Sequence, residues 1–290
     1  MPAPGDPTTP CKAIRAAYRA PLQQLLDSAT AHGCAPRRAT VTCARNSGPS
    51  GTTAKPESTG TATLEAVMRL ARSEGLTADA AEVTMAAGAE GAPRVNLERG
   101  TLQQFCARAE ARILISKSAD AGISVAFAAL VDGGMTRIRG IGIDYVSYAT
   151  GLALLESCSN EELASMFRAD ELRDATRVAE HGVRLSQPLG QFPQDERGHI
   201  ARLRYLLVTF ALKEAAFKSI GEAFSRCAYP ECIESRAGFM DFEVRAALLP
   251  RQEIVPRDAM ADLMSEIGLT RLQATGFAAG TFAGALCFAT

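Results

Sequence analysis

The longest regular pattern of apolar positions in the chain runs from Arg202 to Phe224. Its leucines and phenylalanines recur three and four positions apart, which is the spacing that places side chains on one face of an α-helix. Phe210, Glu214 and Lys218 follow one another at intervals of four, so they form a column along that helix. The pattern predicts one long helix. A Glu–Lys pair at this spacing is ordinarily a solvated ion pair on the surface, and that interpretation stays open here.

A second stretch, Arg137 to Val146, is rich in β-branched residues and glycine, and it predicts a strand that ends on Asp144. A carboxylate at the end of a strand and a carboxylate in a helix can converge on one hard cation even when they are far apart in the sequence. Asp144 and Glu214 are therefore candidate metal ligands. The alternative for Asp144 is that it caps the element that follows.

The rest of the apolar pattern predicts helices at 13–31, 64–73 and 102–110, and strands at 39–44, 81–87, 95–97, 113–116 and 123–131. Parts of this order return in the second half. LEAVMR at 64–69 resembles KEAAFK at 213–218, AAEVTMAA at 80–87 resembles DFEVRAAL at 241–248, and the segment 113–130 resembles the closing residues 271–290. These pairs predict an internal duplication with its junction near Asp132, Gly133 and Gly134. Chance similarity between two alanine-rich amphipathic units is the alternative.

With 290 residues the chain is long enough for two modest domains. We expect an α/β (α+β) fold made of residues 1–133 and 134–290, each an antiparallel sheet packed on a long helix. The net charge of −1 indicates neither nucleic acid nor a membrane surface as a partner. No apolar run is long enough for a membrane span.

The eight cysteines have no CxxC pairing, and the three histidines are distant from any cysteine pair, which argues against a zinc site. Buried free thiols in a reducing compartment are expected, and with them a cytoplasmic location. Residues 1–10 are expected to be flexible, and so is the low-complexity segment 46–62, which should bury no core. No apolar segment typical of a secretory signal follows the N-terminus, whereas the basic character of the first 60 residues leaves an organelle transit peptide open.

GIGID at 140–144 and FALKEAAFK at 210–218 together resemble the signature of the 4′-phosphopantetheinyl transferases, which prime carrier proteins from coenzyme A. That signature is G-[IV]-D followed, after a gap, by [FW]-x-x-K-E-[AS]-x-x-K. The chain matches it at Gly142, Ile143, Asp144, Phe210, Lys213, Glu214, Ala215 and Lys218. Between the two motifs, FRADEL at 167–172 resembles the F-x-x-x-E-L element of the family. The matched part, from about Ile113 to Val244, is a little under half of the chain.

The resemblance implies that the phosphopantetheine arm of coenzyme A is transferred to a serine of an apo acyl or peptidyl carrier protein, giving the holo carrier and 3′,5′-ADP. Such a transfer needs a divalent cation, positive charge near the pyrophosphate and a base near the hydroxyl. Asp144 and Glu214 would bind Mg²⁺, and Glu214 could also help to deprotonate the serine. Lys218 would face the pyrophosphate and Lys213 another phosphate oxygen. The alternative for Lys213 is an exposed helix lysine.

Two positions depart from the family pattern. Longer members carry a third acid two residues after the aspartate, where this chain has Val146. The segment ISKSADAGISVAF resembles the family's coenzyme A-binding I-S-H-S segment, but Lys117 replaces the histidine between Ser116 and Ser118. A lysine keeps donors and positive charge, so phosphate binding is still expected, whereas a proton relay is not. A surface turn at the end of a strand is the alternative.

Arg94 lies near the position of the family's adenine-side Lys-Pro pair and is a plausible substitute for that lysine, since Ala92 occupies its place.

Longer members of the family are single-chain pseudo-dimers with coenzyme A between their halves. The resemblance therefore implies a monomer with a pseudo-twofold pair of halves. A helix expected at Asn160–Arg173 would adjoin the acidic carrier protein, with Arg168, Arg173 and Arg177 as the basic residues that meet it. The alternative is a catalytically degenerate homologue that binds coenzyme A or a carrier protein without transfer. Fatty-acid, polyketide and peptide carriers all remain open.

Overall fold

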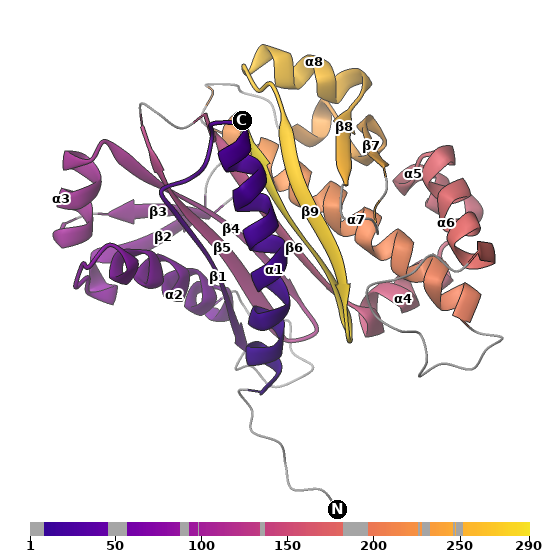
Figure 1. Cartoon of the computed structure of the whole chain (residues 1–290), viewed down its shortest axis with the longest axis horizontal. Coiled ribbons are helices and arrows are strands. Elements are labelled where there is room, and N and C mark those ends of the chain that lie inside the picture. The colour runs from indigo at the N-terminus through magenta and orange to yellow at the C-terminus, as the bar shows by residue number, and fades with distance from the viewer. Residues whose placement is uncertain are drawn as a thin grey trace, which may run out of the picture. The chain divides into compact units, whose positions relative to one another are not determined.

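The computed structural model describes residues 9–45, 57–87, 93–97, 99–133, 137–181, 197–225, 227, 233–245, 247 and 252–290. The chain divides into two compact units, Met1–Ile138 and Arg139–Thr290, which are described one at a time (Figure 1). Several segments with sequence-based expectations lie outside the described residues: 1–8, 46–56, 88–92 and Gly134 of the expected junction.

The first unit is built on a three-stranded antiparallel sheet with the order β1-β5-β4. Its strands are β1 (Arg38–Arg45), β5 (Ile123–Asp132) and β4 (Ala111–Asp120). Two helices, α1 (Thr9–Ala31) and α2 (Glu57–Ser73), pack against β1, and α2 also covers β5. A two-stranded hairpin of β2 (Val83–Ala87) and β3 (Pro93–Leu97) follows α2, and α3 (Thr101–Arg108) leads into β4.

Helix α2 begins inside the low-complexity segment, so the expectation that residues 46–62 bury no core is wrong at their end. Ala62 is buried and forms part of the core between α2 and the sheet. Its carbonyl oxygen accepts a hydrogen bond of 2.6 Å from the Thr42 hydroxyl of β1. The small residues at the start of α2 allow the helix to approach β1 closely. Because the segment is polar and of low complexity, the sequence gives no sign of this contact.

The second unit is built on a three-stranded antiparallel sheet with the order β6-β10-β9. Its strands are β6 (Gly140–Ser147), β10 (Phe282–Ala289) and β9 (Leu272–Ala279), and the long helix α7 (Arg197–Phe224) packs across all three. Between β6 and α7 lie α4 (Tyr148–Ser157), α5 (Asn160–Met166) and α6 (Ala169–His181). After α7 come the hairpin of β7 (Phe242–Arg245) and β8 (Glu253–Pro256) and the helix α8 (Asp258–Glu266).

Two boundaries in the second unit differ from the expected ones. Strand β6 does not end on Asp144, because Tyr145–Ser147 continue the ladder with β10. Ser147 caps α4 by accepting a hydrogen bond from the Thr150 amide, so the alternative role of Asp144 as a cap is wrong. The helix expected at Asn160–Arg173 is two helices, because the extended backbone of the buried Phe167 ends α5.

The two units share one order of elements. Each has a strand, a long helix, a two-stranded hairpin, a short helix and a final hairpin whose last strand pairs with the first strand. Helix α1 is additional in the first unit, and α4, α5 and α6 are inserted in the second. The predicted fold class, an antiparallel sheet packed on a long helix, is confirmed. The pseudo-twofold relation between the halves stays a prediction.

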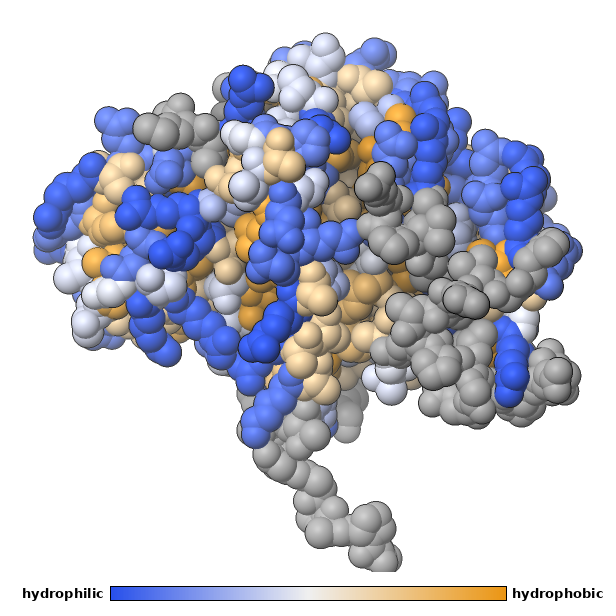
Figure 2. All heavy atoms as spheres, in the orientation of Figure 1, coloured by the Kyte–Doolittle hydropathy of each residue, from blue (hydrophilic) through white to orange (hydrophobic). Residues whose placement is uncertain are grey.

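The outer surface of α1 is mainly polar. Hydrophilic side chains follow the outward side of α1 in Figure 2, whereas Tyr18 and Leu25 on the same helix are buried. Within the described ranges, no helix has both the length and the apolarity required to cross a membrane.

Candidate functional site

Strand β6 and helix α7 approach each other so closely that only glycine fits on the strand. A Cβ atom at Gly142 would collide with the backbone carbonyl oxygen of Ala215, and one at Gly140 with that of Ser219. The glycines of the GIGID motif and the small residues of α7 are therefore required for this contact. The contact fixes where the side chain of Asp144 lies relative to the helix.

The close approach brings together three of the predicted site residues. Asp144 is buried, and its Oδ1 atom accepts a hydrogen bond of 2.7 Å from the Lys218 Nζ atom. The same Nζ atom lies 3.4 Å from Oε2 of Glu214 and 3.4 Å from the carbonyl oxygen of Ile143. The ammonium group of Lys218 is thus held between two carboxylates that come from different elements.

This cluster is not a solvated surface pair. The side chains of Lys218 and Glu214 are only 29% and 26% exposed. Burial alone would lower the pKa of Lys218, but the charges of Asp144 and Glu214 outweigh it and raise that pKa, so the group remains an ammonium. Burial also raises the pKa of Glu214, against the opposing effect of Lys218 and with a further rise from the charge of Asp144.

Lys213 does not join the cluster. Its side chain is fully buried, and its Nζ atom donates a 2.6 Å hydrogen bond to Oε2 of Glu171 and a 3.1 Å bond to the carbonyl oxygen of Met166. Neighbouring residues on an α-helix point in different directions, so Lys213 and Glu214 face different surroundings. The predicted contact of Lys213 with a phosphate does not fit this placement, and the alternative of an exposed lysine is also wrong.

Glu171, the partner of Lys213, has no role that the sequence alone predicts. Its Oε2 atom also accepts a bond of 2.8 Å from the Arg168 amide, and its Oε1 atom accepts one of 2.8 Å from the Val244 amide. This carboxylate therefore ties α6, α7 and β7 together and links the F-x-x-x-E-L element to the K-E-A-x-x-K element. The sequence offers one signal, because Glu171 stands four residues before the apolar Ala175, at the spacing of one helix face, and Ala175 is buried.

The aromatic position of the second motif has a packing role. Phe210 stacks on Phe239, with ring centroids 5.5 Å apart, and Phe217 stacks on the same ring at 5.9 Å. The two phenylalanines of α7 thereby hold the turn before β7 against the helix.

The predicted coenzyme A residues of the first unit lie on β4 and β3. Strand side chains alternate, so Ser116 and Ser118 share one face of the sheet with Leu114, whereas Lys117 lies on the other face with Ile115, toward α2. The three residues cannot grip one phosphate together from this strand. Strand β4 continues to Asp120, so the alternative that Lys117 forms a surface turn is wrong. Arg94 is exposed on β3.

Each of the three arginines proposed to meet a carrier protein has an acidic neighbour. Arg173 pairs with Asp170, Arg177 lies 3.3 Å from Asp174, and Arg168 lies 3.6 Å from Asp258. The surface of α6 is consequently less basic than the arginines alone suggest.

The donor set of the cluster suits a hard cation with few protein ligands. Mg²⁺ prefers oxygen ligands and is commonly held by one or two carboxylates, with water and phosphate completing the shell. Asp144 and Glu214 provide two such carboxylates on facing elements, and Val146 provides none. In the part of the chain that the structure describes, no group of three or more His, Cys, Asp or Glu side chains forms a metal site.

Comparison with protein-family models and with curated proteins finds no match to this sequence. Among solved structures the chain is similar to holo-[acyl-carrier-protein] synthases. The Helicobacter pylori enzyme in complex with coenzyme A is 17% identical with a TM-score of 0.36, and the match covers 52% of this chain and 99% of that one.

The Neisseria meningitidis enzyme is 19% identical with a TM-score of 0.37, covering 53% of this chain and 98% of that one. The Mycobacterium tuberculosis acyl carrier protein synthase is 21% identical with a TM-score of 0.34, covering 53% of this chain and 97% of that one. At these values the activity has to be argued from the chain's own residues.

Proposed function

We propose that this protein transfers the 4′-phosphopantetheine arm of coenzyme A to a serine of an apo carrier protein. The observation that carries the proposal is the cluster of Asp144, Lys218 and Glu214 at the contact of β6 and α7. An ion pair that served only to join the two elements would need one carboxylate. A second carboxylate raises the electrostatic cost of the site, which is typical of a functional group rather than of a structural one.

In the proposed reaction the serine oxygen forms a bond to the β-phosphorus of the pyrophosphate, and the bond from that phosphorus to the 3′,5′-ADP leaving group breaks. Lys218, kept as an ammonium by its two neighbours, is positioned to balance negative charge on the pyrophosphate oxygens. A Mg²⁺ ion held by Asp144 and Glu214 would supply further charge neutralisation when bound. Burial raises the pKa of Glu214, which makes its ionised carboxylate a better acceptor for the proton of the serine hydroxyl.

The pair of Lys213 and Glu171 has a positioning role in this proposal. It anchors α7 to α6 and β7 one residue before Glu214. A carboxylate that must lie within a few tenths of an ångström of its working position benefits from a rigid support of this kind.

Ser116 and Ser118 are retained as proposed hydroxyl donors to coenzyme A phosphates, with Arg94 as a proposed contact on the adenine side. These proposed roles rest on the resemblance of the sequence to the family's motifs. The cleft for coenzyme A between the halves is likewise a prediction from that resemblance.

The experiment is intact-mass spectrometry of apo carrier proteins of the fatty-acid, polyketide and peptide classes. Each is incubated with the protein, coenzyme A and Mg²⁺, with the Asp144→Ala variant as the matched control. The expected result is a gain of one phosphopantetheine on at least one carrier with the native chain and none with the variant. If the protein bound coenzyme A but no carrier gained a phosphopantetheine, the degenerate homologue would be favoured instead. The departures from the family pattern at Val146 and Lys117 support that alternative.

A further inference from the structure

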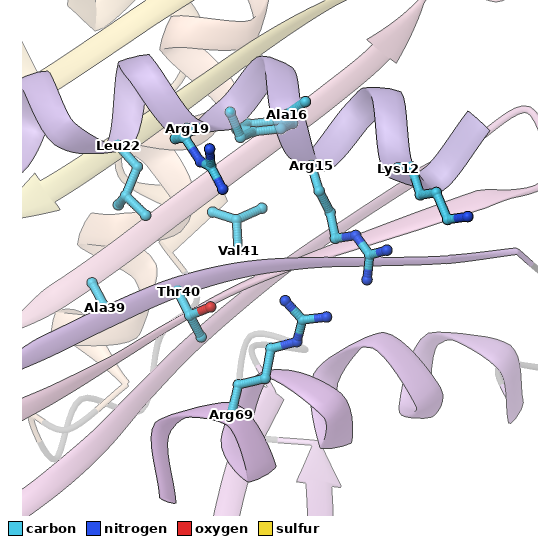
Figure 3. Close-up of a pocket in the computed structure, with 10 residues that line it drawn as sticks. Lys12, Arg15, Ala16, Arg19, Leu22, Ala39, Thr40, Val41 and Arg69 are labelled. Atoms are coloured by element: carbon cyan, nitrogen blue, oxygen red, sulfur yellow. The ribbon is translucent and has the colours of Figure 1, made fainter. Parts of the chain in front are cut away.

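A cavity of about 440 Å³ lies in the first unit between α1, β1 and α2 (Figure 3). Sites for small molecules are typically about 300–1,000 Å³. Four of the residues that line the cavity are cationic and none is acidic: Lys12, Arg15, Arg19 and Arg69. The remainder are mainly apolar or small, so the cavity combines positive charge with a hydrophobic wall.

One carboxylate organises two of these guanidinium groups. The Oε1 atom of Glu65 accepts hydrogen bonds of 2.7 Å and 3.1 Å from Nη2 and Nε of Arg69, and the Nη1 atom of Arg15 lies 3.3 Å from the same oxygen. Two guanidinium groups this close would otherwise repel each other. Glu65 therefore holds them in place but offsets only part of the positive charge around the cavity.

The cationic side chains reach the cavity from two helices. In Figure 3, Arg15 and Arg19 extend from α1 and Arg69 extends from α2, and all three point toward β1. Strand β1 lies at the edge of its sheet and contributes Ala39, Thr40 and Val41 to the lining. A ligand in the cavity would thus meet arginine donors from both helices.

The shared order of elements relates residues at and beside this cavity to the cluster of the second unit. Helix α2 occupies the place of α7, and the similarity of LEAVMR to KEAAFK aligns Glu65 with Glu214 and Arg69 with Lys218. Strand β1 occupies the place of β6. Thr42 pairs with Ala126, the fourth residue of β5, as Asp144 pairs with Ala285, the fourth residue of β10.

The second carboxylate of the second unit is therefore a threonine in the first unit, and additional cations come from α1. The two carboxylates around one lysine suit a metal ion, whereas one carboxylate among four cations suits an anion. The first unit therefore favours an anion where the second unit favours a cation.

We propose that this cavity binds a phosphate-bearing small molecule without a metal ion, through Arg15, Arg19 and Arg69. Guanidinium groups suit such a ligand because their planar N–H donors match two phosphate oxygens at once. The apolar side chains of α1 and β1 provide a wall for the carbon part of the ligand. None of the residues that line this cavity belongs to the proposed transferase site, and neither proposal depends on the other.

The test is isothermal titration calorimetry of the full chain with inorganic pyrophosphate in the presence of EDTA, which removes divalent cations. We expect saturable binding that Arg19→Glu weakens at least about tenfold, because a charge-assisted donor is replaced by a repelling charge. Arg72→Glu, an exposed position on α2 outside the cavity lining, is the matched control and should bind as the native chain does. Lys218→Met, which removes the cation of the transferase cluster, should also bind normally, and succinate should bind more weakly than pyrophosphate.

Arg19 is exposed, so its substitution should leave the fold intact, which circular dichroism checks. The proposal is overturned if the native chain shows no saturable binding, if Arg19→Glu binds as tightly as the native chain, or if binding is lost in Lys218→Met. The last result would place the pyrophosphate at the transferase cluster instead.

Discussion

The buried pair of Lys213 and Glu171 permits a quantitative test of how α7 is held in place. The two side chains are 0% and 1% exposed, and their charged atoms lie 2.6 Å apart. Removing one partner of a buried ion pair typically costs about 3–5 kcal/mol, because the remaining charge has no water to solvate it. The two single substitutions should differ, since the remaining partners of each charge differ.

Lys213→Met leaves Glu171 with hydrogen bonds from the Arg168 and Val244 amides, so we expect a loss of about 3 kcal/mol in the free energy of unfolding. Glu171→Leu leaves the ammonium with the carbonyl oxygen of Met166 and the ring of Phe167, and it removes the acceptor of both amides, so we expect a loss of about 4–5 kcal/mol.

The assay is urea denaturation followed by far-ultraviolet circular dichroism, with both single variants and the double variant. The double variant should lose less than the sum of the single losses, by about 1–3 kcal/mol, because the two substitutions remove one interaction. Glu214→Gln, at the adjacent position on α7, is the control and should lose no stability. Additive losses, or single losses below about 1 kcal/mol, would refute a coupled buried pair.

The remaining predictions concern the cluster, the strand contact and the thiols. Asp144→Ala and Glu214→Ala should each nearly abolish transfer in the mass-spectrometric assay and weaken Mg²⁺ binding in a titration. If Asp144→Ala kept normal turnover, Asp144 would not be a metal ligand. The pKa of Glu214 is raised above 4.5 in the folded state, so the ionisable carboxyl lowers the stability of the fold as the pH rises from 4.5 through that raised pKa. Glu214→Gln should therefore unfold at a higher temperature than the native chain at pH 7 but not at pH 4. Equal shifts of the unfolding temperature at the two pH values would contradict this. Gly142→Ala should destabilise the chain by more than about 2 kcal/mol in urea, because its Cβ meets backbone. Among the described cysteines, native-state alkylation with mass mapping should modify Cys158 and Cys227 first, because the others are buried.

The sequence predicts the main elements well where periodicity is strong. The long helix appears because its apolar positions recur at helical spacing, and the segment pairs at 64–69 and 213–218 occupy equivalent places in the two units. The motif spacing also indicates that Asp144 and Glu214 approach each other. These features depend on local pattern and on residue type, which a single sequence displays.

The features that the sequence does not reveal depend on contacts between distant segments. Lys213 and Lys218 look equivalent in the sequence, yet only the placement of α6 decides which of them meets Glu171. The break at Phe167 arises because its ring is buried with an extended backbone, and no helix-breaking residue announces it. The motif predicts that Lys117 acts with its neighbouring serines, but side chains alternate between the two faces of a strand, so Lys117 and the serines lie on opposite faces.

The shared topology of the two units has an evolutionary consequence. When one order of elements occurs twice in a single chain, a substitution in one unit leaves the corresponding position of the other unit unchanged. Thr42 and Asp144 illustrate this, since they hold equivalent places with different chemistry. Selection can therefore act on each copy separately. Libraries that randomise Arg15, Arg19 and Arg69, which line the cavity, would explore new ligands in the first unit while the second unit keeps its original residues.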